Sequence, residues 1–315
     1  MKGDICLVTG GAGFIGSHLV DVLFQQGATV RILDDLSTGL AENLFHVREH
    51  IQLIHGSILD ESAVKQSMHG VRYVFHLGAL ASVARSVEAP MVSHAACATG
   101  TVMVLDQARL AGVQRVVYAA SSSMYGGSSS ANGQQENQLP CTLSPYAAAK
   151  LAGEYYMQAF AATYGIETVR LRFFNIFGPR QRSDSPYSGV IAIFIDKMSR
   201  GEAPGIHGDG LQSRDFTYVG NAVQALTKAA TAPGVSGKVF NVGTGNSTTV
   251  LDLVQALNQI LGKSLQPKHL DPRTGDVRYS LADISNTIQE LGYQPHVSFY
   301  DGLEKTVQWY QKSQG

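Results

Sequence analysis

The chain has 315 residues, with 24 Lys and Arg against 25 Asp and Glu and a formal net charge of −1. Such a length gives one large domain or two coupled ones, and the charge gives no reason to expect a nucleic-acid or membrane partner. Cys6, Cys97 and Cys141 show neither a disulfide framework nor metal-ligand spacing, so we expect a cytoplasmic protein with no metal site. No apolar run reaches the roughly 20 residues of a membrane-spanning helix.

The most informative pattern lies at the start, where an apolar run over residues 5–8 enters a glycine cluster and a helical pattern follows. Gly10, Gly13 and Gly16 allow a tight turn, close approach of a phosphate to the main chain and close packing of the helix on the strand. The positive end of the helix would face a pyrophosphate. The sequence therefore predicts a dinucleotide-binding strand–turn–helix, and the alternative is a purely structural glycine turn.

A second apolar stretch, residues 29–33, ends in Asp34 and Asp35. An acidic side chain at this strand end suits the ribose 2′-hydroxyl and favours NAD over NADP. The polar turn that follows, Ser37-Thr38-Gly39, is expected to line the adenosine side of the cofactor.

Strand and helix patterns then alternate, which predicts a doubly wound parallel sheet with helices on both faces and ligands at the carboxyl ends of its strands. We expect further strands over 51–57, 71–77, 115–120, 168–174 and 239–243. We expect helices over 14–26, 61–68, 91–111, 145–164, 190–198, 250–261 and 300–312. Residues 1–175 with 215–250 are predicted to form the cofactor domain, and residues 176–214 and 251–315 a smaller substrate lobe.

Tyr146 and Lys150 are four residues apart in the predicted helix 145–164 and share one face. A neighbouring ammonium and the positive nicotinamide would favour the phenolate of Tyr146, which could then take a proton from a substrate hydroxyl. Ser121, at the end of the strand over 115–120, could bond the same oxygen and relay the proton. The alternative for the Tyr–Lys pair alone is an ordinary surface helix.

These motifs together resemble the extended short-chain dehydrogenase/reductases, and among them the UDP-hexose 4-epimerases. The resemblance spans nearly the whole chain and rests on residues 10–16, Ser121 with Tyr125-Gly126, Tyr146 with Lys150, residues 172–179, residues 214–216, and Arg273 with Asp276. It implies a Rossmann sheet with a smaller α/β lobe, a homodimer and a tightly held NAD. It also implies a redox-neutral reaction on a UDP-sugar, in which C4 is oxidised, the 4-keto sugar turns over, and the hydride returns to the other face.

The resemblance also assigns site residues. The catalytic ones are Ser121, Tyr146 and Lys150. Those implied to bind NAD are Gly10, Gly13, Phe14, Ile15, Gly16, Asp34, Asp35, Ser37, Thr38, Gly39, Ser57, Ile58, Leu77, Ala79, Tyr146, Lys150 and Phe173. Those implied to bind the UDP-sugar are Ala81, Ser82, Ser122, Ser123, Asn175, Gly189, Val190, His207, Arg214, Arg273, Asp276 and Ser280.

Related chemistries are disfavoured by the same comparison. Dehydratases of this kind carry Asp-Glu where Ser122-Ser123 stand, and decarboxylating relatives carry Glu at Ser123. Eliminating water requires an acid and a base at these places, and this chain has neither there.

Ser280 bears on the choice of sugar. Relatives restricted to non-acetylated sugars carry a bulky Tyr at this place, whereas a small residue leaves room for a 2-acetamido group. The expected reaction is therefore interconversion of UDP-N-acetylglucosamine and UDP-N-acetylgalactosamine. The alternative activity is UDP-glucose/UDP-galactose epimerisation, with Ser280 a mere turn residue.

Two positions depart from the family pattern. Cys97 stands where an Asn is usual near the active site, and Ser57 where an Asp usually holds the adenine. A third hypothesis, from another class, is a non-catalytic NAD(H) sensor that keeps the fold; the intact Ser121, Tyr146 and Lys150 argue against it.

Overall fold

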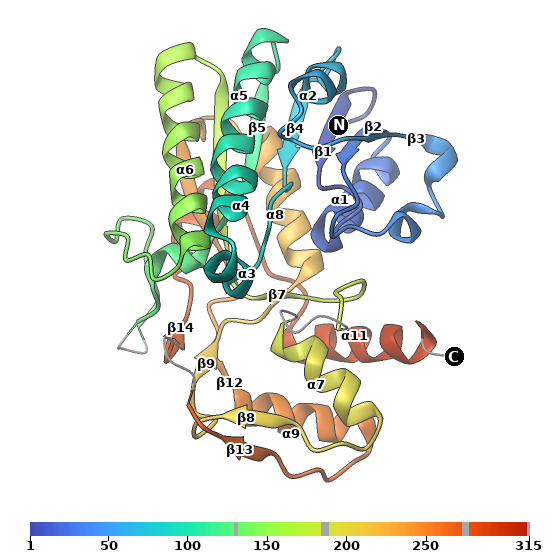
Figure 1. Cartoon of the computed structure of the whole chain (residues 1–315), viewed down its shortest axis with the longest axis vertical. Coiled ribbons are helices and arrows are strands. Elements are labelled where there is room, and N and C mark those ends of the chain that lie inside the picture. Colours follow the sequence, from blue (N-terminus) through green and yellow to red (C-terminus); the bar gives the residue numbers. More distant parts are fainter. Residues whose placement is uncertain (129–131, 184–188, 273–276, 314–315) are drawn as a thin grey trace.

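The computed structural model describes residues 1–128, 132–183, 189–272 and 277–313. A seven-stranded sheet forms its centre, with strand order β11-β6-β5-β4-β1-β2-β3 and every neighbouring pair parallel (Figure 1). Its strands are β1 (Ile5–Thr9), β2 (Thr29–Asp34), β3 (Ile51–His55), β4 (Tyr73–His76), β5 (Arg115–Ser121), β6 (Glu167–Phe173) and β11 (Lys238–Val242).

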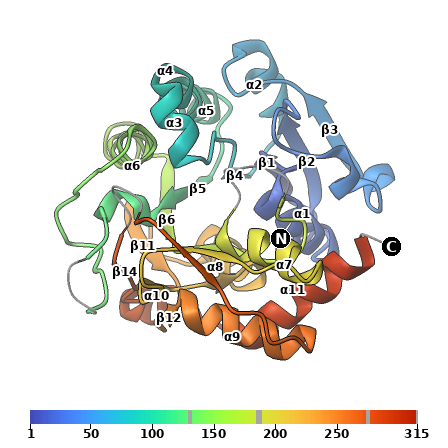
Figure 2. The same ribbon diagram turned by 60° about the horizontal axis from the view of Figure 1, so that its bottom comes forward.

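Helices cover both faces of this sheet, which explains why its strands read as continuous apolar runs. Helices α1 (Phe14–Gln25) and α8 (Val219–Thr231) share a core with one face. Helices α2 (Glu61–Ser67), α5 (Gly100–Leu110) and α6 (Pro145–Tyr164) share a core with the other. Figure 2 shows the two helical layers on either side of the strands. The fold is therefore a doubly wound Rossmann sheet, as predicted.

The strand order reverses at β1, which lies between β2 and β4. Connections on the two sides of β1 run to opposite faces, so the loops after β1 and β4 diverge and leave a crevice at the carboxyl ends of the strands. The glycine turn after β1 and the segments after β4 and β5 therefore meet at one edge of the sheet.

A third core lies beyond that edge, below the sheet in Figure 1. There α7 (Val190–Ser199), α9 (Val250–Leu261) and α11 (Phe299–Ser313) pack around Phe177 and Phe216. Short strands complete this part and its junction with the sheet: β7 (Ile176–Phe177), β8 (Gly205–His207), β9 (Ser213–Arg214), β10 (Thr217–Tyr218), β12 (Thr248–Thr249), β13 (Lys268–Leu270) and β14 (Tyr279–Ser280). Helix α10 (Ser285–Leu291) packs against the edge strand β11 and α8.

The seven predicted strands are confirmed to within two residues at either end, and the 145–164 helix is confirmed residue for residue. Three helices, α3 (Val83–Glu88), α8 and α10, were not predicted. Helix α8 buries a face made largely of Ala, which gives a weak apolar signal along the sequence yet fits closely against β5 and β6.

The prediction of one uniform helix over 91–111 is wrong. The structure has α3 (Val83–Glu88), then α4 (Pro90–His94), the π-helical segment η3 (Ala95–Thr99) and α5. Pro90 starts α4, and Ala89 before it has φ −137°, as expected for a residue that precedes proline. Three 3₁₀ turns were also missed: η1 (Ala41–Leu44), η2 (Arg48–His50) and η4 (Ser122–Tyr125).

Among the helices that the structure describes, none is both long and apolar enough to cross a lipid bilayer.

Candidate active site

The turn after β1 is built from backbone that only glycine accommodates. Gly10 has φ +70°, and a Cβ there would lie 2.9 Å from the Gly78 nitrogen at the end of β4. A Cβ on Gly16 would lie 2.1 Å from the Gly10 oxygen, so α1 could not pack this close with any other residue. Gly13 caps α1 without a side chain, which leaves the N–H groups of its first turn, beginning at Phe14 and Ile15, to a ligand. This cradle fits a pyrophosphate.

The residues predicted on the adenosine side converge on the same turn. Asp34 is buried and accepts hydrogen bonds from the Ala12 and Leu36 nitrogens, both at 2.9 Å, so it ties the end of β2 to the glycine turn. Burial raises the pKa of Asp34, and these two hydrogen bonds oppose the rise. Asp35 is exposed and accepts from the Ser37 hydroxyl at 2.6 Å. After Thr38, Gly39 packs directly on Ala12 and Asp34.

The remaining predicted cofactor residues line the ends of β3, β4 and β6. The Ser57 hydroxyl accepts from the Leu59 nitrogen at 3.2 Å, which shapes the loop after β3. Ile58 packs between Gly78 and Gly100. Leu77 and Ala79 follow β4, and Phe173 ends β6.

The structure places Ser121 near Tyr146. Ser121 is the last residue of β5, and its hydroxyl lies close enough to the Tyr146 phenol, in the first turn of α6, to lower the pKa of that phenol. The Ser121 and Ser123 hydroxyl oxygens are 2.8 Å apart, so a second hydroxyl continues this chain, while Ser122 is the first residue of η4. Ser144 caps α6 by accepting from the Ala147 nitrogen at 3.1 Å and thereby fixes the start of the helix that carries the phenol.

Burial dominates the electrostatics of the pair Tyr146 and Lys150. It raises the pKa of Tyr146 well above that of an exposed phenol; Cys97 adds to the rise, and the Ser121 hydroxyl opposes it. Lys150 is 3% exposed, and its Nζ lies 4.2 Å from the ring centroid of Tyr118. Burial lowers the pKa of Lys150, against the influence of Cys97 and Glu154. In the protein alone the phenol is therefore neutral, and the group that lowers its pKa is Ser121.

Of the residues predicted to bind substrate, some are brought together. Arg214 in β9 and Ser280 in β14 are directly paired in parallel register, and Ser280 is 9% exposed. Asn175, held at φ +39°, donates to the backbone oxygen of Asp215 at 3.3 Å and so lies beside Arg214.

The other predicted substrate residues lie on other elements. Ser82 caps α3 and follows the exposed Ala81, while Gly189 and Val190 start α7 in the smaller lobe. The ring Nδ1 of His207, also in this lobe, hydrogen-bonds the Asp271 backbone oxygen at 2.8 Å. Arg273 and Asp276 lie outside the described residues.

A buried polar chain beneath the site was not predicted. The Gly78 nitrogen donates to the Thr9 hydroxyl, which is 2.8 Å from His76 Nδ1; His76 Nε2 is 3.0 Å from the Thr101 hydroxyl, which donates to the Cys97 backbone oxygen. Since Thr101 uses its proton on Cys97, Nε2 of His76 must carry the ring proton and Nδ1 must accept from Thr9. The chain links the ends of β1 and β4 to η3. A lone histidine at the end of a buried strand was the available signal.

Asp215 is a second buried group that was not assigned a role. It is fully buried and accepts from the nitrogens of Thr244 and Gly245 at 2.8 and 2.9 Å. It therefore fastens the segment that carries Arg214 to the loop after β11. Its place beside Arg214 in the sequence was the only signal.

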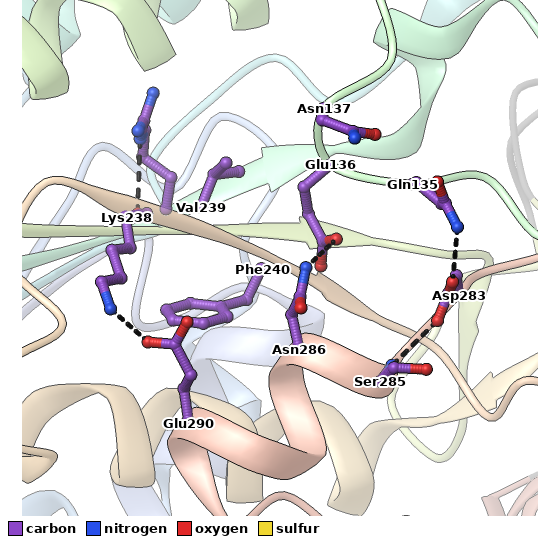
Figure 3. A pocket seen from close by; sticks show the side chains of 11 residues that line it. Gln135, Glu136, Asn137, Lys238, Val239, Phe240, Asp283, Ser285, Asn286 and Glu290 are labelled. Carbon is purple, nitrogen blue, oxygen red and sulfur yellow. Dashed lines mark hydrogen bonds and ion pairs between the residues drawn. The ribbon is translucent and has the colours of Figure 1, made fainter.

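A separate cavity of about 630 Å³ lies along the edge strand β11, beside the loop 135–137 and α10 (Figure 3). Lys238 forms an ion pair with Glu290 at this cavity, and Asn286 donates a hydrogen bond to the Glu136 carboxylate at 3.0 Å. Ser121, Tyr146 and Lys150 do not line this cavity, so it is distinct from the candidate active site.

His76 generates a pH prediction. Its pKa is lowered to about 3 by burial and by Lys150, so the unfolded chain binds one more proton than the native chain between about pH 3 and pH 6.5. Stability should fall as the pH drops below about 6.5, by up to about 1.4 kcal/mol per pH unit from this residue. We expect His76→Gln to be less stable at neutral pH, yet to lose less stability between pH 7 and pH 5, as measured by urea unfolding.

The exposed His69 provides the matched control, because His69→Gln should retain the wild-type pH dependence. Identical slopes for His76→Gln and the wild type would show that the buried ring does not govern acid stability.

Comparison with known proteins agrees with this geometry. Residues 6–243 match the model of the NAD dependent epimerase/dehydratase family. The UDP-glucose 4-epimerase of Mycolicibacterium smegmatis is 38% identical, over 98% of this chain and 99% of its own. The crystal structure of UDP-glucose 4-epimerase from Thermotoga maritima with UDP-glucose superimposes with TM-score 0.94 and 38% identity, covering 99% of this chain and 100% of its own.

A UDP-N-acetylglucosamine 4-epimerase from Methanobrevibacter ruminantium, in complex with UDP-N-acetylmuramic acid, is equally similar in structure. Its TM-score is 0.94 at 37% identity, covering 99% of this chain and 100% of its own. The glycine cradle and these likenesses together identify NAD as the cofactor, and the chain belongs to the NAD dependent epimerase/dehydratase family.

Proposed function

We propose that this protein epimerises a UDP-sugar at C4 and that its substrate pair is UDP-N-acetylglucosamine and UDP-N-acetylgalactosamine. The observation that carries the proposal is the proximity of the Ser121 hydroxyl to the Tyr146 phenol, with Lys150 one helical turn further on, at the edge of the sheet that holds the glycine cradle. Similar proteins of this family named as 4-epimerases support the reaction type.

In this mechanism Tyr146 takes the proton of the sugar C4 hydroxyl and later returns it. Bound NAD⁺ supplies the hydride acceptor and donor. Tyr146 acts as a phenolate in this step, a form that the Lys150 ammonium and the positive nicotinamide of bound NAD⁺ would favour. The Ser121 hydroxyl donates to that phenolate, and Ser123 behind it keeps Ser121 oriented. Lys150 contributes a fixed positive charge in a buried site, where such charges act strongly. The overall reaction is redox-neutral, because the hydride removed from C4 in the first half-reaction would return to C4 in the second.

The lobe 176–214 with 251–315 is proposed to hold the UDP moiety, and residues 1–175 with 215–250 to hold NAD. Arg214, together with Arg273, is proposed to pair with the diphosphate, where a guanidinium can form two parallel hydrogen bonds. Asn175 is proposed to contact the diphosphate or the sugar.

Replacing the proposed base tests the reaction directly. Tyr146→Phe removes only the phenolic oxygen, so we expect kcat to fall by about 10²–10⁴-fold while bound NAD is retained. The assay resolves UDP-N-acetylglucosamine and UDP-N-acetylgalactosamine by chromatography. Tyr164→Phe, an exposed Tyr at the other end of α6, is the control and should match the wild type. Full turnover by Tyr146→Phe would refute the catalytic assignment of Tyr146, whereas a wild type that binds NAD but turns over no UDP-sugar would favour a non-catalytic NAD(H) sensor.

Ser280 tests the choice of sugar. It is nearly buried beside Arg214, so a large side chain there would occupy the space proposed for the acetamido group. Ser280→Tyr should lower kcat/KM for UDP-N-acetylglucosamine by about 10–200-fold relative to UDP-glucose, which is the range that one group in a pocket commands. Ser280→Ala keeps the space and should retain the wild-type preference. A wild-type enzyme that turns over UDP-glucose but no N-acetylated sugar would establish the alternative, UDP-glucose/UDP-galactose epimerisation.

We further propose that two copies of the chain associate through α3, α4 and α6. These helices pack side by side and expose Val87, Met91 and Val92 at 66, 76 and 55%, together with Tyr155 at 54%. Such a patch on adjacent helices suits a two-fold interface with a second copy.

The oligomer prediction uses Met91→Glu combined with Val87→Glu, which places charge in the patch. Light scattering after size exclusion should give a dimer for the wild type and a monomer for the variant. Phe45→Glu, at a 57% exposed residue directly after η1, should leave the dimer intact. A wild-type monomer would contradict the proposed interface.

A further inference from the structure

A buried ion pair joins the helix of the proposed base to β6, the strand next to the edge strand β11. Glu154, one turn beyond Lys150 in α6, and Arg172 in β6 have side chains that are only 1 and 7% exposed. Arg172 Nε lies 3.1 Å from both Glu154 carboxylate oxygens, and Nη2 donates to Oε2 at 2.8 Å. Burying such a pair costs desolvation free energy, so the pair is weak evidence for stability alone.

The Nη1 side of the Arg172 guanidinium, which does not contact Glu154, extends the chain of hydrogen bonds to Tyr125 in η4. Its Nη1 donates to the Tyr125 hydroxyl at 2.8 Å, and its Cζ lies 5.0 Å from the Tyr125 ring centroid. Burial raises the pKa of Tyr125 to about 12, so the phenol keeps its proton and donates it to Asn241 Oδ1 at 2.7 Å. Tyr125 therefore accepts from one side and donates to the other.

Asn241 is the far end of this chain, and each of its polar atoms forms a hydrogen bond. Its backbone nitrogen donates to Glu136, its side-chain nitrogen donates to the Gln134 backbone oxygen at 2.7 Å, and its own backbone oxygen accepts from Thr287 at 2.6 Å. It lies in the edge strand β11, where these contacts replace a neighbouring strand. The chain is thus anchored to rigid structure.

Tyr125 closes η4, the single turn that begins directly after Ser121. The polar chain Glu154–Arg172–Tyr125–Asn241 therefore connects the turn of Ser121 and Ser123 to the helix of Tyr146 and Lys150 through side chains alone. Hydroxyl oxygens in a proton relay must stay within hydrogen-bond reach, and a displacement of about 1 Å can cost 10²-fold in rate.

We propose that Tyr125, Arg172 and Glu154 are positioning residues that hold the Ser121 turn in hydrogen-bonding register with the Tyr146 helix. The inference rests on the proposed function, because that function assigns Ser121 and Tyr146 their chemistry. None of the three positioning residues is required to touch the substrate.

Tyr125→Phe tests the inference with the removal of one oxygen. We expect kcat to fall about tenfold, with KM for the UDP-sugar and retention of NAD unchanged. Amide hydrogen exchange at residues 121–126 should become faster, because the turn loses its link to Arg172. Tyr293→Phe is the matched control: Tyr293 is also fully buried and donates to the Gly243 backbone oxygen at 2.8 Å, away from η4. If Tyr125 had a purely structural role, both variants would have a lower melting temperature and their kcat values would be the same.

Arg172→Lys keeps the positive charge beside Glu154 but loses the planar fork that reaches Glu154 and Tyr125 together. It should lower kcat as Tyr125→Phe does, and the double variant should lose little more than either single variant, since both break one chain. Multiplicative losses would show independent roles and overturn the proposal.

The exchange measurement separates this inference from the proposed function. Unchanged exchange at 121–126 in Tyr125→Phe overturns the positioning role whether or not the protein epimerises a UDP-sugar. A wild-type chain that epimerises no UDP-sugar, with faster exchange in Tyr125→Phe, would overturn the function and leave the mechanical link established.

Discussion

The contact between the glycine turn and the end of β4 constrains everything else in the site. Gly10 approaches Gly78 so closely that a single methyl group would collide with the backbone. This approach places the uncapped start of α1 beside the segments that follow β4 and β5. The phosphate cradle and the Ser121–Tyr146 pair therefore lie at the same edge of the sheet. A reaction between a dinucleotide and a sugar requires this proximity.

Two chains of buried, hydrogen-bonded polar groups support the candidate active site. Thr9, His76 and Thr101 form one directed chain beneath the ends of β1 and β4, and Glu154, Arg172 and Tyr125 form another across β6. Buried polar groups are costly unless satisfied, and satisfied ones are directional, so they fix geometry in a way that apolar packing does not. The two chains hold different elements in place. The first holds η3, and the second holds η4 and α6.

The segment that carries Arg214 is joined to the sheet by hydrogen bonds as well as by packing. The Asp215 carboxylate accepts hydrogen bonds from the backbone nitrogens of Thr244 and Gly245. The segment bearing Arg214 is therefore held against the loop after β11. Ser280 then lies opposite Arg214 because β14 pairs with β9. The residue proposed to select the sugar and the residue proposed to bind the diphosphate are therefore parts of one small sheet.

The sequence by itself determined the features that depend on local chemistry. These are the seven strands, the glycine turn, the acidic end of β2 and the helix that carries Tyr146 and Lys150, since each is encoded in a short run of residues. Only the tertiary structure decided the partners of buried polar groups, the packing of α8 and the break of the predicted 91–111 helix around η3. Tyr125 and Asn241 are 116 residues apart along the chain, and no local pattern records which hydroxyl meets which amide. Periodicity reports which face is buried, whereas hydrogen-bond partners are chosen by the three-dimensional packing of distant segments.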